Sequence, residues 1–335
     1  MANRDIVAIG TSAGGVKALI ALAQNFPEQL SAAVLVTIHL PADAKSVLDE
    51  ILTGAGPLPA HFAEDGETMR TGHIHIAPPG RHLLMEDDRL RLGHGPRENN
   101  VRPAIDPMLR SAAICCGPRL IGVVLTGTLG DGASGLWAVG ACGGITVVQD
   151  PADAEFAQMP ETALERVRAD HVVGLADLPK LLARLVDQPA GLPVPVPDGL
   201  RFDVEIARTG RAAMHELDHH GRRSVLACPD CGGVMWEFDE GELLRFRCHV
   251  GHAYTAEMMT LALDENVRRA IASALRGFEE RIALVEKLAE QSEHDARPSL
   301  AANWRQRAIE YRREIAVLEE ALQRMDRAGS RVVAE

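Results

Sequence analysis

Short apolar runs alternate with longer amphipathic segments over the first half of the chain. The runs are rich in Val and Ile and are bounded by Gly, Pro or Asp, which is typical of buried strands. We predict strands at 6–9, 33–38, 73–77, 120–125, 145–148 and 171–173. Helical spacing of apolar residues predicts helices at 16–25, 106–116, 133–141, 160–168 and 178–185, with a hairpin at 81–92. This alternation predicts a three-layer, doubly wound α/β fold with a mostly parallel sheet.

The second half of the chain has a different pattern. Four prolines lie within residues 188–197, so we predict a linker at 188–200 after an α/β domain at 1–187. A small Cys/His module at 201–262 follows. Beyond it, apolar residues recur at spacings of three and four on both sides of a polar stretch at 291–299, which predicts an antiparallel helical hairpin at 263–329. Either helix could instead pair with its twin in a second chain, giving a homo-oligomer.

Composition and charge exclude several classes of function. The chain of 335 residues carries a formal net charge of -12, so it offers no broad attraction to a phosphate backbone and we expect no nucleic-acid partner. No apolar run approaches the roughly 20 residues that span a bilayer, so we expect a protein that is not embedded in a membrane. Because the N-terminus carries no export signal, we predict a cytoplasmic location.

The first predicted strand leads into a glycine-flanked turn that contains Ser12. The segment Gly10-Thr-Ser-Ala-Gly-Gly15 resembles a nucleophile elbow, in which small neighbours expose the hydroxyl and N–H groups near Ala13 or Gly14 could stabilise an oxyanion. A glycine-rich turn before a helix also binds phosphates and dinucleotides. The glycines here match neither GxGxxG nor GxxxxGK[ST], which favours the nucleophile.

Two further polar residues follow predicted strands. His39 comes directly after the strand at 33–38, and Asp131 follows the strand at 120–125 in another strand-to-helix turn. Because parallel strands end at one edge of the sheet, Ser12, His39 and Asp131 could form a relay in which the carboxylate orients the imidazole. Taken singly, Ser12 and Asp131 could be helix caps and His39 a structural histidine.

These motifs resemble the catalytic domain of chemotaxis methylesterases, the CheB family. The resemblance rests on Gly10–Gly15, Ile38-His-Leu-Pro41 and Thr126-Gly-Thr-Leu-Gly-Asp-Gly132, and extends over roughly residues 4–186. It departs from the family's usual TGMGxDG at Thr128 and Leu129. The chain also begins directly with the catalytic strand, so we expect no control by a phosphoacceptor domain in cis.

The resemblance implies a Ser-His-Asp hydrolase that removes methyl esters from receptor glutamates and deamidates receptor glutamines. Ser12 would be the nucleophile, His39 the general base and Asp131 the orienting carboxylate, while His82 and Thr128 would line the site. Catalysis would need no cofactor. The implied partners are a methylated receptor or signalling protein, and a methyltransferase or kinase. The competing hypothesis is a regulatory or scaffold module that keeps the hydrolase fold and uses its other parts to bind partners.

A cluster of cysteines and histidines lies in the second half of the chain. Cys228 and Cys231 form a CxxC followed by glycines, and Cys248 is followed by His249 and His252. We predict a zinc-ribbon-like site with Cys228, Cys231, Cys248 and His252 as ligands, and His249 as the alternative to His252. Four protein ligands leave no open position for water, so the zinc would be structural. Reduced thiols without metal are the alternative.

Overall fold

A seven-stranded parallel sheet forms the centre of the first half of the protein. The structure is a computed structural model that describes residues 3–211, 214–240 and 243–332. Within these residues the sheet has the strand order β3-β4-β2-β1-β7-β8-β9, and every pairing in it is parallel. The strands of this half are β1 (Ile6–Thr11), β2 (Ala33–Ile38), β3 (Ala60–Phe62), β4 (Ile74–Ile76), β5 (His82–Glu86), β6 (Arg89–Gly93), β7 (Leu120–Val124), β8 (Ile145–Gln149) and β9 (His171–Val173).

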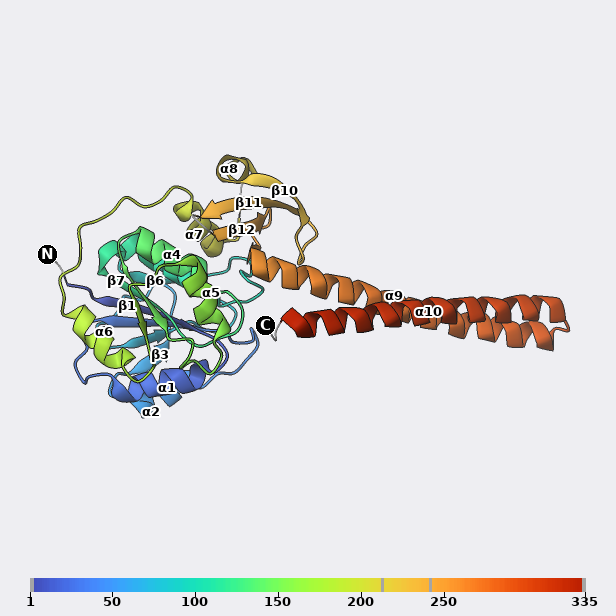
Figure 1. Cartoon of the computed structure of the whole chain (residues 1–335), viewed down its shortest axis with the longest axis horizontal. Helices are drawn as coiled ribbons and strands as arrows, with labels where there is room; N and C mark the ends of the chain where they lie inside the picture. The colour runs from blue at the N-terminus through green and yellow to red at the C-terminus, as the bar shows by residue number, and fades with distance from the viewer. Residues whose placement is uncertain (1–2, 212–213, 241–242, 333–335) are drawn as a thin grey trace. The chain divides into compact units, whose positions relative to one another are not determined.

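Helices cover both faces of this sheet. They are α1 (Gly15–Asn25), α2 (Leu48–Ala55), α3 (Ile105–Cys116), α4 (Ala133–Ala141), α5 (Gln158–Arg166) and α6 (Leu178–Val186), with a short 3-10 turn at Gly117–Arg119. Along β1, Val7 and Ile9 pack in the core with α1, α2 and α6, while Ile6 and Ala8 pack in the core with α3, α4 and α5 (Figure 1). This period-two alternation on a fully buried strand produces the three layers.

The predicted fold class is confirmed, although some elements escaped the sequence pattern. All six predicted strands and five predicted helices of this half exist, with ends that differ by up to two residues, and the hairpin is β5–β6. The sequence did not predict β3 or α2. β3 is three half-buried residues at the edge of the sheet, too short to show a period of its own.

The Cys/His module packs within the same compact unit as the α/β sheet. After α7 (Leu200–Thr209) and α8 (Met214–His220), a four-stranded antiparallel sheet is built from β10 (Arg222–Ala227), β11 (Val234–Glu240), β12 (Leu243–Cys248) and β13 (Ala253–Thr255). The chain divides into compact units at Met1–Met259 and Thr260–Glu335, so the module and the α/β half share one unit. Ion pairs of Glu98 with Arg245 and Arg247 are among the contacts that join them.

Two long helices, α9 (Ala256–His294) and α10 (Pro298–Val332), make up the rest of the chain. Ion pairs join Glu286 to Arg312 and Glu293 to Arg305, so the two helices run antiparallel. Val285, Ala289, Ala301 and Ala308 are buried between them, whereas Val267 of the predicted apolar stripe is 48% exposed. No helix within the described residues is both long enough and apolar enough to cross a bilayer.

Candidate active site

Ser12 lies in the turn that joins β1 to α1. Its backbone N–H donates to the Thr126 carbonyl over 3.1 Å, and its carbonyl accepts the Gly15 N–H over 2.9 Å. Gly14 precedes the helix with φ of 75°, in the left-handed region that glycine adopts without strain. The turn is therefore held to the loop after β7, and its short side chains leave the serine half-exposed at the carboxyl edge of the sheet.

His39 and Asp131 meet Ser12 at this edge. Because β1 lies between β2 and β7 in the sheet, the three residues that follow these strands converge. The Ser12 hydroxyl lies 2.9 Å from His39 Nδ1, and His39 Nε2 lies 2.7 Å from Asp131 Oδ2. The three residues predicted as a relay thus form one continuous chain of hydrogen bonds.

Four hydrogen bonds hold the Asp131 carboxylate. Oδ2 accepts His39 Nε2–H and, over 2.6 Å, the backbone N–H of Ile105 at the start of α3. Oδ1 accepts the side-chain amide of Asn99 over 3.0 Å and the Asp106 backbone N–H over 3.3 Å. Burial acts to raise the pKa of Asp131, but the bonds from His39, Ile105 and Asn99 outweigh it and lower this pKa to about 2.

An ionised Asp131 determines the tautomer of His39. A carboxylate without a proton only accepts, so His39 carries its hydrogen on Nε2 and leaves the Nδ1 lone pair toward the serine. His39 Nδ1 is therefore the atom able to take the proton from the Ser12 hydroxyl. The imidazolium formed in that step would lie 2.7 Å from a buried negative charge, which would stabilise it.

Backbone donors are available beside Ser12. In the portion of the chain described, the N–H groups of Ala13 and Gly14 have no hydrogen-bond partner. The loop after β7 approaches closely, since a Cβ on Gly127 would lie 2.9 Å from the Ser12 Cβ. Thr128, predicted to line the site, is the next residue after Gly127 in this loop.

His82 is the other residue predicted to line the site. It is fully buried, its Nε2 lies 2.9 Å from the Pro96 carbonyl, and its Nδ1 accepts the Ala104 N–H over 3.2 Å. Burial lowers the pKa of this imidazole and favours the neutral ring that such a pair of bonds requires. Both ring nitrogens of His82 therefore contact the backbone, and the bond to Ala104 supports the residue just before Ile105.

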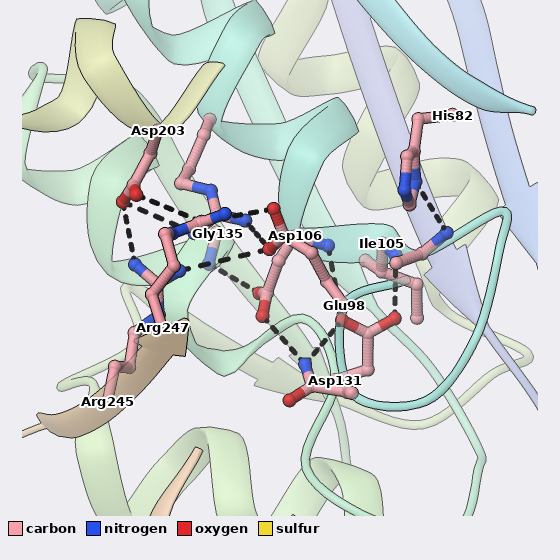
Figure 2. A network of polar contacts seen from close by, with 12 residues as sticks. His82, Glu98, Ile105, Asp106, Asp131, Gly135, Asp203, Arg245 and Arg247 are labelled. Atoms are coloured by element: carbon pink, nitrogen blue, oxygen red, sulfur yellow. Dashed lines mark hydrogen bonds and ion pairs between the residues drawn. The ribbon is translucent and has the colours of Figure 1, made fainter. Parts of the chain in front are cut away.

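A buried polar network surrounds Asp131, and the sequence reasoning missed it. Glu98 forms ion pairs with Arg110 and Arg247, and Asp203 lies 2.8 Å from Arg245 and 2.9 Å from Arg247 (Figure 2). Arg245 and Arg247 are two positions apart on β12, so both side chains lie on the same face of this strand. Charged residues at alternate positions of a strand normally mark a solvated face, so the sequence signal for burial was weak.

Asp106, the second residue of α3, is a buried carboxyl group close to the negative charge of Asp131. Its Oδ1 accepts the N–H groups of Gly132 and Gly135, and its Oδ2 accepts the same Asn99 amide that reaches Asp131. Burial and the neighbouring Asp131 charge raise its pKa to about 7. By contrast, the surrounding arginines overcome the burial of Glu98 and hold its pKa below the usual range.

The predicted zinc ligands lie together at one end of the antiparallel sheet. His252 Nδ1 is 3.6 Å from Cys228 Sγ and 3.5 Å from Cys248 Sγ, and the sulfurs of Cys231 and Cys248 are 3.7 Å apart. A tetrahedral zinc ion with Zn–S near 2.3 Å and Zn–N near 2.0 Å separates two sulfurs by about 3.8 Å and sulfur from nitrogen by about 3.6 Å. The donor set therefore fits zinc in both chemistry and spacing, and His249 is not part of the four.

A second cluster joins His61, Glu67 and His75 at the β3–β4 edge. Glu67 lies 3.1 Å from His61 Nε2 and from His75 Nδ1. His75 Nε2 accepts the Arg70 backbone N–H, so its proton sits on Nδ1 and points at the carboxylate. A metal on Nδ1 would displace that proton, and we therefore interpret the cluster as a hydrogen-bonded support of the sheet edge.

A cavity of about 290 Å³ opens beside His39. Pro41, Arg97 and Arg102 are among the residues that line it, and no acidic side chain does. Burial, Arg97 and Arg81 lower the pKa of Arg102, which indicates a local excess of positive charge in a chain of net charge -12. The site therefore has a cationic cavity next to the imidazole of His39.

Comparison with known proteins places this site in a family. A family model described as CheB methylesterase matches residues 7–182. The chain belongs to the CheB methylesterase family. A putative protein-glutamate methylesterase/protein-glutamine glutaminase of Leptospira interrogans is 36% identical over 184 residues, which are 55% of this chain and 95% of that protein. The protein-glutamate methylesterase/protein-glutamine glutaminase of Pyrococcus abyssi is 33% identical, and the match covers 56% of this chain and 52% of that one.

A solved structure supports the same assignment. The crystal structure of the Thermotoga maritima CheB methylesterase catalytic domain aligns with a TM-score of 0.53 at 32% sequence identity. The alignment covers 56% of this chain and all of that domain. The CheB methylesterase domain accounts for β1 to α6, and the Cys/His module and the long helices lie beyond the matched region.

Proposed function

We propose that this protein hydrolyses glutamyl methyl esters on chemoreceptor-like signalling proteins, with deamidation of glutamines as a second activity. Ser12 is the nucleophile, His39 the general base and then acid, and Asp131 the orienting carboxylate. The observation that supports these roles is the chain of hydrogen bonds at 2.9 Å and 2.7 Å that links the three side chains. The names of the Leptospira and Pyrococcus relatives agree with this reaction.

The proposed reaction has two stages. The Ser12 hydroxyl attacks the ester carbonyl as His39 Nδ1 takes its proton, and the imidazolium then protonates the departing methoxide, which leaves as methanol. Water, deprotonated by the same nitrogen, hydrolyses the glutamyl-serine ester and frees a glutamate carboxylate. For a glutamine side chain the leaving group is ammonia. The N–H groups of Ala13, Gly14 and Thr128 are our proposed donors to the oxyanion.

The substrate we propose is a protein segment rich in carboxylates. Arg97 and Arg102 in the cavity beside His39 suit such a segment, because guanidinium groups pair with carboxylates in two-pronged geometry. A methylated receptor helix would present the ester among acidic neighbours and the product would add another carboxylate. A methyltransferase that forms the ester is the partner this chemistry requires.

We also propose that Cys228, Cys231, Cys248 and His252 hold a structural zinc ion. Four protein ligands fill a tetrahedral shell, so the ion would hold the ends of β11, β12 and β13 together and take no part in the chemistry at Ser12. The support for this proposal is the spacing of the four ligand atoms, which all lie within 4.8 Å of one another.

Methanol release tests the proposed reaction. The full chain is incubated with a synthetic peptide that carries a glutamate γ-methyl ester among other glutamates, and methanol is measured. Ser12→Ala should abolish release, while Ser299→Ala, an exposed serine of α10, should not change it. A fluorophosphonate probe should label the wild type and the Ser299→Ala variant, but not Ser12→Ala. Folded wild-type protein that neither reacts with the probe nor releases methanol would instead favour the scaffold function.

A further inference from the structure

Asn99 connects the Cys/His module to the carboxylate of the triad. Its side-chain amide donates to Asp131 Oδ1 over 3.0 Å, and its Oδ1 accepts the Thr255 backbone N–H over 3.1 Å. Its own backbone N–H donates to the Ala253 carbonyl over 2.8 Å. Carboxylates only accept, so the orientation of the amide is determined, with NH₂ toward Asp131 and oxygen toward β13. Every one of these groups is buried.

Glu98, the residue before Asn99, is held by the same module. Arg247 Nη2 lies 3.1 Å from Glu98 Oε1, and Arg247 Nη1 donates to the Gly251 carbonyl over 2.9 Å. Arg247 is 1% exposed and Glu98 is 1% exposed, so water does not replace either partner. Glu98 and Asn99, of which Asn99 bonds to Asp131, are thus held to β12 and β13 by buried polar contacts.

The contacts start directly beside the proposed zinc ligands. Arg247 precedes Cys248 in the chain, and Ala253 follows His252. The Tyr254 hydroxyl donates to Asp230 over 2.7 Å, and Asp230 lies between Cys228 and Cys231. Two of the four ligands, Cys248 and His252, and the residues that reach Glu98 and Asn99 therefore lie at the same ends of β12 and β13.

We propose that the Cys/His module is a metal-dependent support for the triad, in which bound zinc positions Asp131 through Asn99. Asn99 is a positioning residue, since it touches the carboxylate and not the substrate. Loss of the metal releases the turn between β12 and β13, and Asn99 then no longer anchors Asp131 Oδ1. The inference rests on the proposed esterase function, and it makes zinc a controlling ligand of an enzyme whose reaction needs no metal.

The size of the effect follows from the geometry of the relay. Asp131 retains its bonds to His39 and Ile105, so the triad loosens without coming apart. Misplacement of a catalytic group by about 1 Å can cost about 100-fold in rate. We expect metal removal to lower kcat by about 10- to 100-fold. KM should rise as well, because Arg97, which lines the cationic cavity, accepts the Ala253 N–H of the module through its backbone carbonyl.

A cycle of metal removal and Asn99→Gly tests the proposal on the full chain. Asn99 has φ of 50°, which glycine adopts without strain, so Asn99→Gly keeps the backbone and removes the side-chain bonds to Asp131, Asp106 and Thr255. Zinc per chain is measured before and after treatment with a chelator, and kcat and KM are measured with the methyl-ester peptide. Asn99→Gly should lower kcat about as much as zinc loss does. In the Asn99→Gly variant, zinc loss should then lower kcat by less than about threefold, since the substitution has already removed the link from the module to Asp131.

Two matched controls accompany the cycle. Asn25→Gly removes an exposed asparagine at the end of α1 that makes one side-chain hydrogen bond. Cys115→Ser, on α3, is matched to Cys231→Ser, which removes the exposed sulfur ligand. Both controls should keep zinc and kcat, whereas Cys231→Ser should lose zinc and kcat together.

Hydrogen exchange provides a readout that does not depend on activity. Zinc removal should speed exchange at the backbone N–H groups of Asn99 and Thr255, and leave β8 unchanged. Zinc loss that leaves kcat and these exchange rates unchanged would overturn the proposal, as would a native chain that binds no zinc. If the zinc-loaded wild type releases no methanol, the esterase function fails, and hydrogen exchange still decides whether the module supports Asp131.

Discussion

Removing the negative charge of Glu98 should strongly destabilise the protein, even though the substitution by Gln hardly changes the size of the side chain. Glu98→Gln keeps the shape of the side chain but removes the charge that faces Arg110, Arg245 and Arg247. Without the Glu98 charge, Asp203 remains as an ionised carboxylate in contact with all three of these buried guanidinium groups. Removing one partner of a buried ion pair costs about 3–5 kcal/mol, because the other charge stays buried without compensation.

An exposed Glu–Arg ion pair on the same protein serves as the control for the effect of burial. Glu205 lies 2.9 Å from Arg208 on α7, with both side chains about half exposed to water. An exposed pair of this kind contributes about 0–1 kcal/mol, so Glu205→Gln should have almost no effect. The same chemical change at two sites therefore differs by about 2 kcal/mol or more through burial alone.

Urea unfolding measures the difference. The free energy of unfolding is extrapolated to water for the wild type and both variants from tryptophan fluorescence and circular dichroism. Equal values for Glu98→Gln and Glu205→Gln would refute the argument from buried charge. If Glu98→Gln is instead more stable than the wild type, the free energy needed to remove these charges from water exceeds the free energy that their ion pairs contribute.

Three further predictions concern the site. Gly10→Ala should destabilise the protein by about 1–3 kcal/mol in urea unfolding, because the new Cβ would lie 2.2 Å from Ile105 Cγ2; unchanged stability would contradict this packing. Asp131→Asn should lower kcat about 10⁴-fold in the methanol assay while circular dichroism stays native, because in either orientation the amide NH₂ faces groups that donate, and the relay loses its negative charge; a loss below tenfold would exclude the relay. The raised pKa of Asp106 means that the folded state binds the extra proton, so its contribution to stability is complete below pH 4 and is lost as pH rises through about 7. As pH rises from about 4 to about 7, the wild type should therefore lose stability relative to Asp106→Asn, by up to about 1.4 kcal/mol per pH unit. A stability difference that does not change with pH would contradict the raised pKa of Asp106.

The sequence by itself determined the α/β fold and the residues of the relay. Buried strands such as Ala33–Ile38 are continuous Val/Ile runs between breakers, a local pattern that depends on no distant residue. Parallel strands also end at one edge, so Ser12 and His39 were predictable neighbours once their strands were recognised. The candidate zinc ligands were also recognisable from local sequence, because the spacings of Cys228 to Cys231 and of Cys248 to His252 are typical of zinc ligands in short turns.

Only the tertiary structure decided what surrounds these residues. His82 stands in a motif that resembles the family site, yet its ring nitrogens bind the backbone at Pro96 and Ala104. Asn99 and Arg247 are 148 positions apart in sequence order, and nothing in their neighbours indicates that both would be buried near Asp131. Burial of charge depends on long-range partners that neutralise one another, and hydrophobic periodicity contains no information about them. The dependence of the triad on the Cys/His module is for this reason a property of the fold.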